Sequence, residues 1–197
     1  RLNGAKILFF EPPGRSRNSA GRKVRPGITV HTLPPILEVD ERYRLLFQHG
    51  CHKHARFILR QMEHCRFWEP LLWCGTPEAV HLLELLPHRG VVYDCARDWS
   101  DLPPRWESDL ALAADVVFAA SSQLAERLAP CSSNIALLPN GVNYPMFSGE
   151  GGSIQSDPLP QVHGPVLGWA GVIHRELDLS PILYAARERP GWTFLLL

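Results

Sequence analysis

The sequence lacks several features that would assign a protein to a broad class at once. Its 20 Lys and Arg residues balance its 20 Asp and Glu residues, so no net charge draws it to nucleic acid, and we expect no nucleic-acid partner. It contains no apolar run near the roughly 18 residues that a membrane-spanning helix needs. It also opens without a Met or a signal peptide, so we do not expect Arg1 to be the natural start.

A disulfide framework and a metal site are missing as well. The five cysteines are odd in number and include no C-x-x-C pair, which favours free thiols in a reduced, cytosolic setting. The segment from Cys51 to Cys65 also holds His52, His54 and His64, but on a helix its two ends lie about three turns, roughly 15 Å, apart. One ion cannot bridge that distance, so we expect no bound metal.

The chain does contain a regular alternation of short apolar runs and amphipathic segments. The runs predict strands at residues 5–10, 28–33, 70–74, 90–93, 115–119 and 134–138, and the segments predict helices at residues 44–65, 77–86, 104–113 and 121–128. Apolar strands that alternate with helices are typical of a parallel sheet covered on both faces. We therefore predict a doubly wound α/β fold of the Rossmann type.

A change of composition divides the chain. Residues 148–164 are rich in Gly, Pro and Ser and have no periodicity, which predicts a linker after a first domain at residues 1–147. Residues 165–197 then predict a strand, a helix and a second strand. One β-α-β unit is too small to bury a core of its own, so we expect the opening of a truncated second domain.

Four ordered motifs resemble bacterial glycosyltransferases of family 4. They are V-V-Y-D-C-A-R-D-W-S at residues 91–100, A-A-D-V-V-F-A-A-S-S-Q-L-A-E-R-L at 113–128, L-L-P-N-G-V-N-Y-P-M-F at 137–147 and P-V-L-G-W-A-G-V-I-H-R-E-L-D-L at 165–179. The likeness is greatest to the group that makes teichuronic acid or exopolysaccharide.

This resemblance implies a GT-B fold, in which two Rossmann-like domains face each other across a cleft. It implies an enzyme that moves a sugar from a nucleoside diphosphate to a glycan or lipid-linked acceptor, with retention and with neither a metal nor a further cofactor. It also implies a location in the bacterial cytoplasm or at the inner face of the membrane. The family's Glu-x7-Glu segment would lie beyond Leu197, so residues 1–197 alone are expected to be inactive.

Two carboxylates are candidate catalytic residues. Asp94 follows a predicted strand, and ligands of parallel α/β sheets bind beyond the carboxyl ends of strands, where a carboxylate can accept a hydroxyl proton or hold a sugar hydroxyl. The resemblance also leads us to expect an Asp-Asp pair near Trp99, of which Arg97 replaces the first member and Asp98 remains. The alternative is that either carboxylate caps the turn after the strand.

Two loops are candidate donor-binding segments. Gly171 would let backbone amides approach a diphosphate, and His174 and Arg175 of the same loop could pair with its oxygens. The resemblance places Asn140 and Gly141 beside the interdomain cleft. The simpler interpretations are a tight turn at Gly171, a solvated charge at Arg175 and an ordinary Asn-Gly turn.

A run of positive charge without an acid between its members lies in a loop predicted at residues 15–26. It could contact an anionic acceptor, such as a lipid-linked diphosphate, or the acidic surface of a membrane, and a solvated loop is the alternative. Its members are Arg15, Arg17, Arg22, Lys23 and Arg25.

Two further hypotheses stay open. The chain could belong to a different enzyme of the same fold, such as a nucleotide-sugar 2-epimerase, or to a non-catalytic GT-B-like binding subunit. A requirement for an acceptor would distinguish a transferase from an epimerase, whereas Arg97 is the feature that favours a non-catalytic protein.

Overall fold

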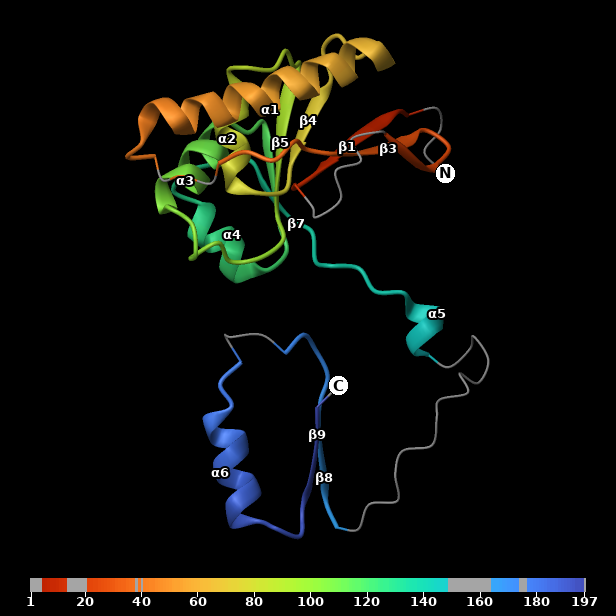
Figure 1. The fold of residues 1–197 in the computed structure, drawn as a ribbon, viewed down its shortest axis with the longest axis vertical. Coiled ribbons are helices and arrows are strands. Elements are labelled where there is room, and N and C mark those ends of the chain that lie inside the picture. The colour runs from red at the N-terminus through yellow and green to blue at the C-terminus, as the bar shows by residue number, and fades with distance from the viewer. Residues whose placement is uncertain are drawn as a thin grey trace. The chain divides into compact units, whose positions relative to one another are not determined.

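The chain divides into two units, Arg1–Val142 and Asn143–Leu197, in a computed structural model (Figure 1). The structure describes residues 5–13, 21–37, 39, 41–148, 164–173 and 177–196. The division falls before residue 147, where the composition predicts the first domain to end, and the predicted boundaries at 147 and 164 stay predictions.

Four short apolar strands form the central parallel sheet of the first unit. Their order is β4 (Leu71–Cys74), β5 (Gly90–Cys95), β6 (Val116–Ala119) and β7 (Ile135–Leu137), and each strand is parallel to its neighbour. Parallel pairing needs crossovers, which contain the 3₁₀ turn η1 (Pro77–Ala79) with α2 (Val80–Leu83), then α3 (Pro104–Ala113) and α4 (Ser122–Leu128). The predicted parallel alternation of strands and helices is confirmed.

The crossover helices bury one face of this sheet. Tyr93, Leu110 and Val117 are fully buried there and form the centre of the main core. Helix α4 begins one residue after the predicted start at residue 121, because Ser121 is its N-cap and accepts a hydrogen bond at 3.3 Å from the backbone N–H of Leu124. That bond satisfies a donor that the first turn of a helix leaves without a partner.

A second sheet of the first unit has the order β1 (Ile7–Glu11), β3 (Ile28–Thr32) and β2 (Arg22–Arg25). Strands β1 and β3 are parallel, whereas β2 pairs antiparallel with β3 through a turn in which Gly27 has φ 82°. The sequence predicts a loop at residues 15–26, and the structure corrects this at residues 22–25, which form β2. All four of its side chains are exposed, and charged side chains on an edge strand discourage pairing with another chain.

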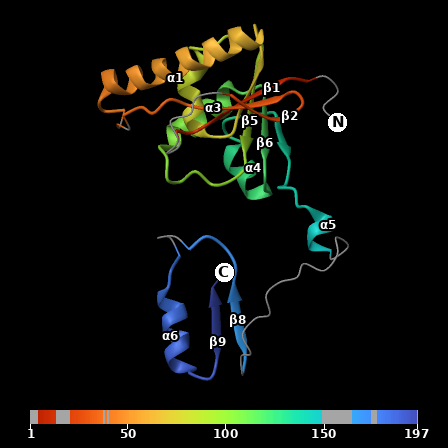
Figure 2. The same ribbon diagram turned by 45° about the vertical axis from the view of Figure 1, so that its right-hand side comes forward.

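The α/β class is confirmed, but the described strands of the first unit form two hydrogen-bonded ladders instead of one. Strands β1 and β3 run across the direction of β4 and β5 (Figures 1 and 2). Helix α1 (Arg44–Cys65) packs its buried residues Ile58 and Met62 in a cluster that also includes Leu8 of β1 and Leu72 of β4. Packing under α1, rather than backbone pairing, therefore joins the two sheets.

Helix α1 has its predicted bounds, while two other elements differ from prediction. The helix predicted at residues 77–86 is a 3₁₀ turn followed by a short α-helix that ends at Leu83. Strand β5 continues past the predicted end at residue 93 as far as Cys95, because Asp94 and Cys95 pair with Phe118 and Ala119 of β6. Strand β5 is therefore longer than predicted because it pairs with β6, and a local sequence pattern carries no information about such pairing.

The second unit contains α5 (Tyr144–Phe147) and a β-α-β motif of β8 (Val166–Trp169), α6 (Ser180–Glu188) and β9 (Thr193–Leu196). Strands β8 and β9 are parallel, as the sequence predicts. None of the described residues of this unit is buried, and Leu183 and Tyr184 of α6 are more than half exposed. The described part of the unit therefore has no core, as expected for one β-α-β motif.

His31 on β3 is a buried histidine in the first unit. Only 4% of the residue is exposed, and neither ring nitrogen has a hydrogen-bond partner among the described residues. Its ring centroid lies 5.7 Å from that of Phe10 and 6.3 Å from that of Phe57. Burial is the main cause that lowers the pKa of His31 below the ordinary value of 6.5, and the charge of His64 acts in the same direction.

Acidification should therefore destabilise the first unit. The unfolded chain takes up a proton at His31 near pH 6.5, whereas the folded protein takes it up only at lower pH, so stability is lost as the pH falls below about 6.5. We expect a lower urea midpoint at about pH 5.5 than at about pH 7.5, and a smaller difference in His31→Leu. The exposed-histidine control His49→Gln should keep the wild-type difference. Equal pH dependence in His31→Leu and wild type would contradict the assignment.

Candidate functional site

Asp94 lies on the face of the central sheet opposite to the helix-covered core. Its neighbours Tyr93 and Cys95 are fully buried in that core, and side chains alternate along a strand, so the Asp94 carboxylate points to the other face. The sequence predicts that Asp94 follows the strand, and the structure corrects this by placing it within β5, paired with Phe118. Backbone pairing therefore holds the carboxylate in a fixed position.

Two aromatic side chains accompany this carboxylate. Nε1 of Trp73 on β4 donates a hydrogen bond to Oδ2 of Asp94 at 3.0 Å, and its ring stacks on Phe118 with centroids 5.5 Å apart. Because Trp73 is 56% exposed, an apolar ring and a carboxylate are presented together to solvent. Sequence reasoning missed both aromatic residues. Their alternation with core residues along β4 and β6 could have indicated that they lie on the other face of the sheet.

Asp98 lies in the loop between β5 and α3 and makes the contacts of a turn residue. Its Oδ1 accepts a hydrogen bond from the backbone N–H of Ser100 at 3.1 Å and lies 3.9 Å from Nη1 of Arg127. No contact between described residues joins Asp98 to Asp94. The two predicted catalytic carboxylates are therefore held by separate partners.

Glu107 on α3 is a buried carboxylate that sequence reasoning missed, and it is only 5% exposed. Its Oε1 accepts hydrogen bonds from the Tyr93 hydroxyl at 2.8 Å and from Nη2 of Arg127 at 3.0 Å, while Nη1 of Arg127 donates to Oε2. The Cys95 thiol lies 3.4 Å from the same Oε1. Arg127 of α4 thereby connects buried Glu107 with exposed Asp98. A Glu at a core-facing helix position was the signal in the sequence.

Burial and hydrogen bonding keep the partners of Glu107 protonated. Burial raises the pKa of Tyr93, as do its hydrogen bonds with Cys95 and Glu107, and burial also raises the pKa of the Cys95 thiol. The hydrogen bond with Glu107 raises the pKa of Arg127. Phenol, thiol and guanidinium therefore act together as donors to one carboxylate.

Arg97 stands where the resemblance leads us to expect a carboxylate, and its surroundings suit a cation. The guanidinium carbon lies 3.7 Å from the centre of the Trp99 ring, and Nη2 pairs with Asp101 at 3.2 Å. Both contacts depend on positive charge. An Asp at this position would repel Asp101 and would lose the contact with the ring.

Gly171 follows β8, where the sequence predicts a donor-binding turn. A Cβ at this position would lie 2.9 Å from ring atoms of Trp169, so a larger residue would have to displace that ring. His174 and Arg175, the other two residues predicted for this loop, lie outside the described residues.

Asn140 and Gly141 follow β7 in an extended segment of the first unit. Both residues are exposed, and neither belongs to a turn, which differs from the simpler interpretation of an ordinary Asn-Gly turn. A Cβ on Gly141 would meet no atom within 4 Å, so local packing does not require glycine there.

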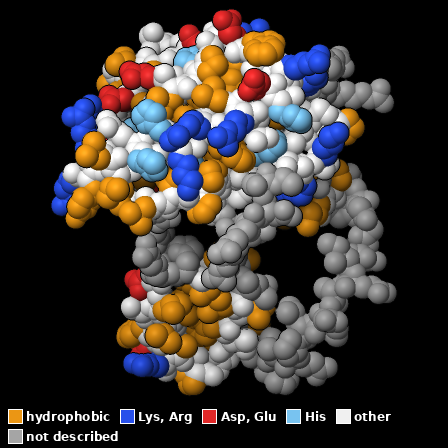
Figure 3. Space-filling view, turned by 45° about the horizontal axis from the view of Figure 1, so that its top comes forward, with side chains coloured by type: hydrophobic (Ala, Val, Ile, Leu, Met, Phe, Trp, Pro, Cys, Tyr) orange, Lys and Arg blue, Asp and Glu red, His pale blue; other side chains and the backbone are white. Residues whose placement is uncertain are grey.

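Basic side chains occur on two surfaces of the first unit. Arg22, Lys23 and Arg25 are exposed on β2, while Arg15 and Arg17 lie outside the described residues. The second surface is the exposed side of α1, which has one acidic residue, Glu63, and Figure 3 shows Lys, Arg and His side chains gathered on one face of this unit. The exposed basic residues of α1 include Arg44, Lys53, Arg56 and Arg60. No helix within the described ranges is long and apolar enough to span a bilayer.

The histidines and cysteines of α1 do not converge. His52 contacts the backbone oxygen of Gln48 at 2.8 Å, and His54 contacts that of Pro34 at 3.0 Å. In the part of the chain that the structure describes, no group of three His, Cys, Asp or Glu side chains could hold a metal ion.

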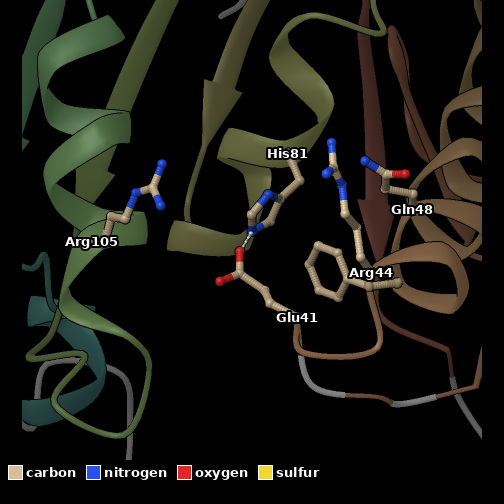
Figure 4. A pocket seen from close by; sticks show the side chains of 6 residues that line it. Glu41, Arg44, Gln48, His81 and Arg105 are labelled. Carbon is tan, nitrogen blue, oxygen red and sulfur yellow. Dashed lines mark ion pairs between the residues drawn. The ribbon is translucent and has the colours of Figure 1, made fainter.

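A cavity of about 500 Å³ lies where α1, α2 and α3 meet, and a second of about 540 Å³ adjoins it. The first is lined by Glu41, Arg44, Phe47, Gln48, His81 and Arg105 (Figure 4). Burial lowers the pKa of His81, although the charge of Glu41 acts in the opposite direction. Sequence reasoning missed this cavity, because its residues come from α1 with the turn before it, from α2 and from α3, which are separate in the chain.

A relative and a similar solved structure can be set beside this geometry, whereas no protein-family model matches the chain. The relative is TuaH of Bacillus subtilis (strain 168), whose name describes a teichuronic acid biosynthesis glycosyltransferase. The two are 29% identical over an alignment of 144 residues, and the match covers 63% of this chain and 36% of TuaH. The chain thus spans little more than a third of the length of this relative.

The similar structure is that of a sucrose-phosphate synthase from Thermosynechococcus elongatus. It has a TM-score of 0.53 and 14% sequence identity, and the match covers 76% of this chain and 84% of that one. The chain has a GT-B fold. The resemblance to GT-B glycosyltransferases drawn from the four motifs is thereby confirmed. Within this GT-B fold, β4 to β7 carry the Asp94 site, and β8 follows as the first strand of a further parallel sheet.

Glu107 should matter chiefly to folding. We expect Glu107→Ala to lower the free energy of unfolding by about 2–3 kcal/mol, because the change leaves Tyr93 and Arg127 without their shared acceptor. Asp109→Asn is the matched control, since it alters only an exposed pair with Arg105, and it should cost less than about 0.5 kcal/mol. Urea denaturation of both variants measures the difference, and equal losses would contradict the role of Glu107.

Proposed function

We propose that this chain belongs to a glycosyltransferase that moves a sugar from a nucleoside diphosphate to a glycan or lipid-linked acceptor. The observation that carries the proposal is a GT-B fold combined with 29% identity to a glycosyltransferase over 144 residues. Because the name of TuaH refers to teichuronic acid biosynthesis, the proposed product is a polysaccharide of the bacterial cell envelope. The proposed location is the cytoplasm or the inner face of the membrane.

The acceptor is proposed to bind beside Asp94. The exposed Trp73 ring offers an apolar surface to the C–H face of a sugar, and the Asp94 carboxylate offers an acceptor for a hydroxyl hydrogen. In the proposed step the acceptor oxygen bonds to the anomeric carbon of the donor, with retention. The bond from that carbon to the diphosphate breaks, the diphosphate leaves with the electron pair, and the hydroxyl proton passes to Asp94. Asp98 is the second proposed catalytic residue, and it accepts a hydrogen bond from the Ser100 N–H in the loop between β5 and α3.

The donor-binding residues are proposed from the sequence. Gly171 allows backbone amides to approach a diphosphate, and His174 and Arg175 supply hydrogen bonds and charge. Asn140 and Gly141 are the other proposed donor-binding residues. The proposed reaction uses neither a resident metal nor a further cofactor, and residues 1–197 alone are proposed to be inactive.

Asp94→Asn tests the proposal in a full-length protein that contains this chain. We expect the rate of sugar transfer to fall about 100-fold, the scale of a lost general base. Thermal stability should hold, because Asn still accepts the Trp73 hydrogen bond. Glu126→Gln, which changes an exposed carboxylate on α4, is the control and should retain the wild-type rate. The wild-type rate itself should persist in EDTA. An unchanged rate in Asp94→Asn rejects the role of Asp94, and epimerisation of the donor without an acceptor would instead assign an epimerase.

Peripheral membrane contact is proposed for the basic residues of β2. Arg22, Lys23 and Arg25 are all exposed on one edge strand, as an anionic surface requires. Each basic residue near an anionic bilayer contributes about 1 kcal/mol, so replacing all three with Gln should weaken binding about 100-fold.

Co-sedimentation with vesicles of phosphatidylglycerol and phosphatidylcholine measures this binding. A control with Arg89, Arg187 and Arg189 replaced by Gln removes the same charge from other exposed positions and should bind as wild type. Equal losses in the two triple variants would show that net charge, rather than β2, governs the contact.

A further inference from the structure

The cavity between α1, α2 and α3 places two guanidinium groups on opposite sides of a histidine. Arg44 and Gln48 of α1 lie on one side of His81, and Arg105 of α3 lies on the other, with Glu41 next to the imidazole (Figure 4). Three helices therefore contribute to one pocket of about 500 Å³, a size that suits a small organic ligand.

The hydrogen-bond donors of this cavity exceed its acceptors. Arg44 has no hydrogen bond or ion pair with any described residue. Arg105 uses only Nε, which donates to Asp109 at 3.2 Å, so its two terminal nitrogens have no partner in the described part of the chain. A guanidinium presents its donors as a planar fork, which matches the paired oxygens of a phosphate or a carboxylate.

Glu41, the carboxylate of the cavity, is already engaged. Its Oε1 accepts a hydrogen bond from Nε1 of Trp106 at 2.7 Å and lies 3.6 Å from Nε2 of His81. The His81 ring is held edge-on between Phe47 and Trp106, with centroids 4.8 Å from each. Aromatic contacts thus fix Glu41 and His81 against each other, and neither arginine is neutralised by Glu41.

We propose that this cavity binds an acidic sugar, meaning a hexose that carries a phosphate or a carboxylate. Arg44 and Arg105 hold the anionic group, while Gln48 and the second oxygen of Glu41 hydrogen-bond to hydroxyl groups. A bare phosphate would leave most of the 500 Å³ unfilled, and Phe47 supplies an apolar wall for the sugar ring. The choice of a sugar rests on the proposed glycosyltransferase function, with the acidic sugar as the acceptor or its terminal residue. The anionic character rests on the two arginines alone.

Calorimetric titration of the 197-residue chain tests the site with four probes: glucuronate, glucose 6-phosphate, glucose and inorganic phosphate. We expect one of the two acidic sugars to bind at least about ten-fold more tightly than glucose, and which of them does so identifies the anionic group. The preferred acidic sugar should also bind more tightly than inorganic phosphate, and its affinity should fall with added NaCl. The proposal would be overturned if glucose bound as tightly as glucuronate and glucose 6-phosphate. It would also be overturned if inorganic phosphate bound as tightly as glucose 6-phosphate.

Two single variants localise the binding. Arg44→Gln and Arg105→Gln should each weaken the acidic sugar about ten-fold, because each removes charge-assisted hydrogen bonds at an exposed position. Arg60→Gln on the same helix as Arg44 is the control and should bind as wild type. Circular dichroism confirms that each variant folds. Unchanged affinity in both cavity variants would place the binding elsewhere.

The outcome is separable from that of the proposed function. Binding in the cavity without sugar transfer by the full-length protein would refute the transferase and leave the site standing. Sugar transfer that is unaffected by Arg44→Gln and Arg105→Gln, with no acidic sugar bound, would refute the site and leave the transferase standing.

Discussion

The packing of β5, α3 and α4 depends on the buried carboxylate of Glu107. An unpaired charge in a protein interior costs several kcal/mol, so its donors must converge from every element around it. Glu107 itself lies on α3. It accepts hydrogen bonds from Tyr93 of β5 and from Arg127 of α4, so it links three elements. Because Arg127 also approaches Asp98, the same group positions the loop between β5 and α3.

The alternation of side chains along β5 separates this structural network from the candidate chemistry. Tyr93 and Cys95 point into the core, whereas Asp94 between them points to the opposite face, where it meets Trp73 and Phe118. A shift of one residue in the pairing of β5 would exchange these roles and bury a carboxylate without its donors. The pairing of β5 with β4 and β6 is therefore as important to the site as the identity of Asp94.

The three candidate surfaces of the first unit differ in chemistry. The Asp94 face combines a carboxylate with an exposed indole, and the edge strand β2 is basic and solvated. In the cavity between α1, α2 and α3, Arg44 has no partner among the described residues, and Arg105 uses only Nε, which pairs with Asp109. The proposed contacts with a sugar ring, an anionic group and a charged surface would therefore use separate residues, since each contact needs a different kind of side chain.

Local patterns in the sequence determined the elements. The apolar runs, the bounds of α1 and the parallel β-α-β motif of the second unit could all be read from residues adjacent in the chain, because hydrophobic periodicity is a local property. The motifs also indicated the GT-B fold and selected Asp94. Only the tertiary structure decided that β2 is a strand and that Asp94 lies within β5 and contacts Trp73. It also decided that Glu107 meets Tyr93 and Arg127 in the core and that two arginines line the cavity beside His81. These features arise from strand pairing and helix packing between segments distant in sequence, whose register and contacts no local pattern records.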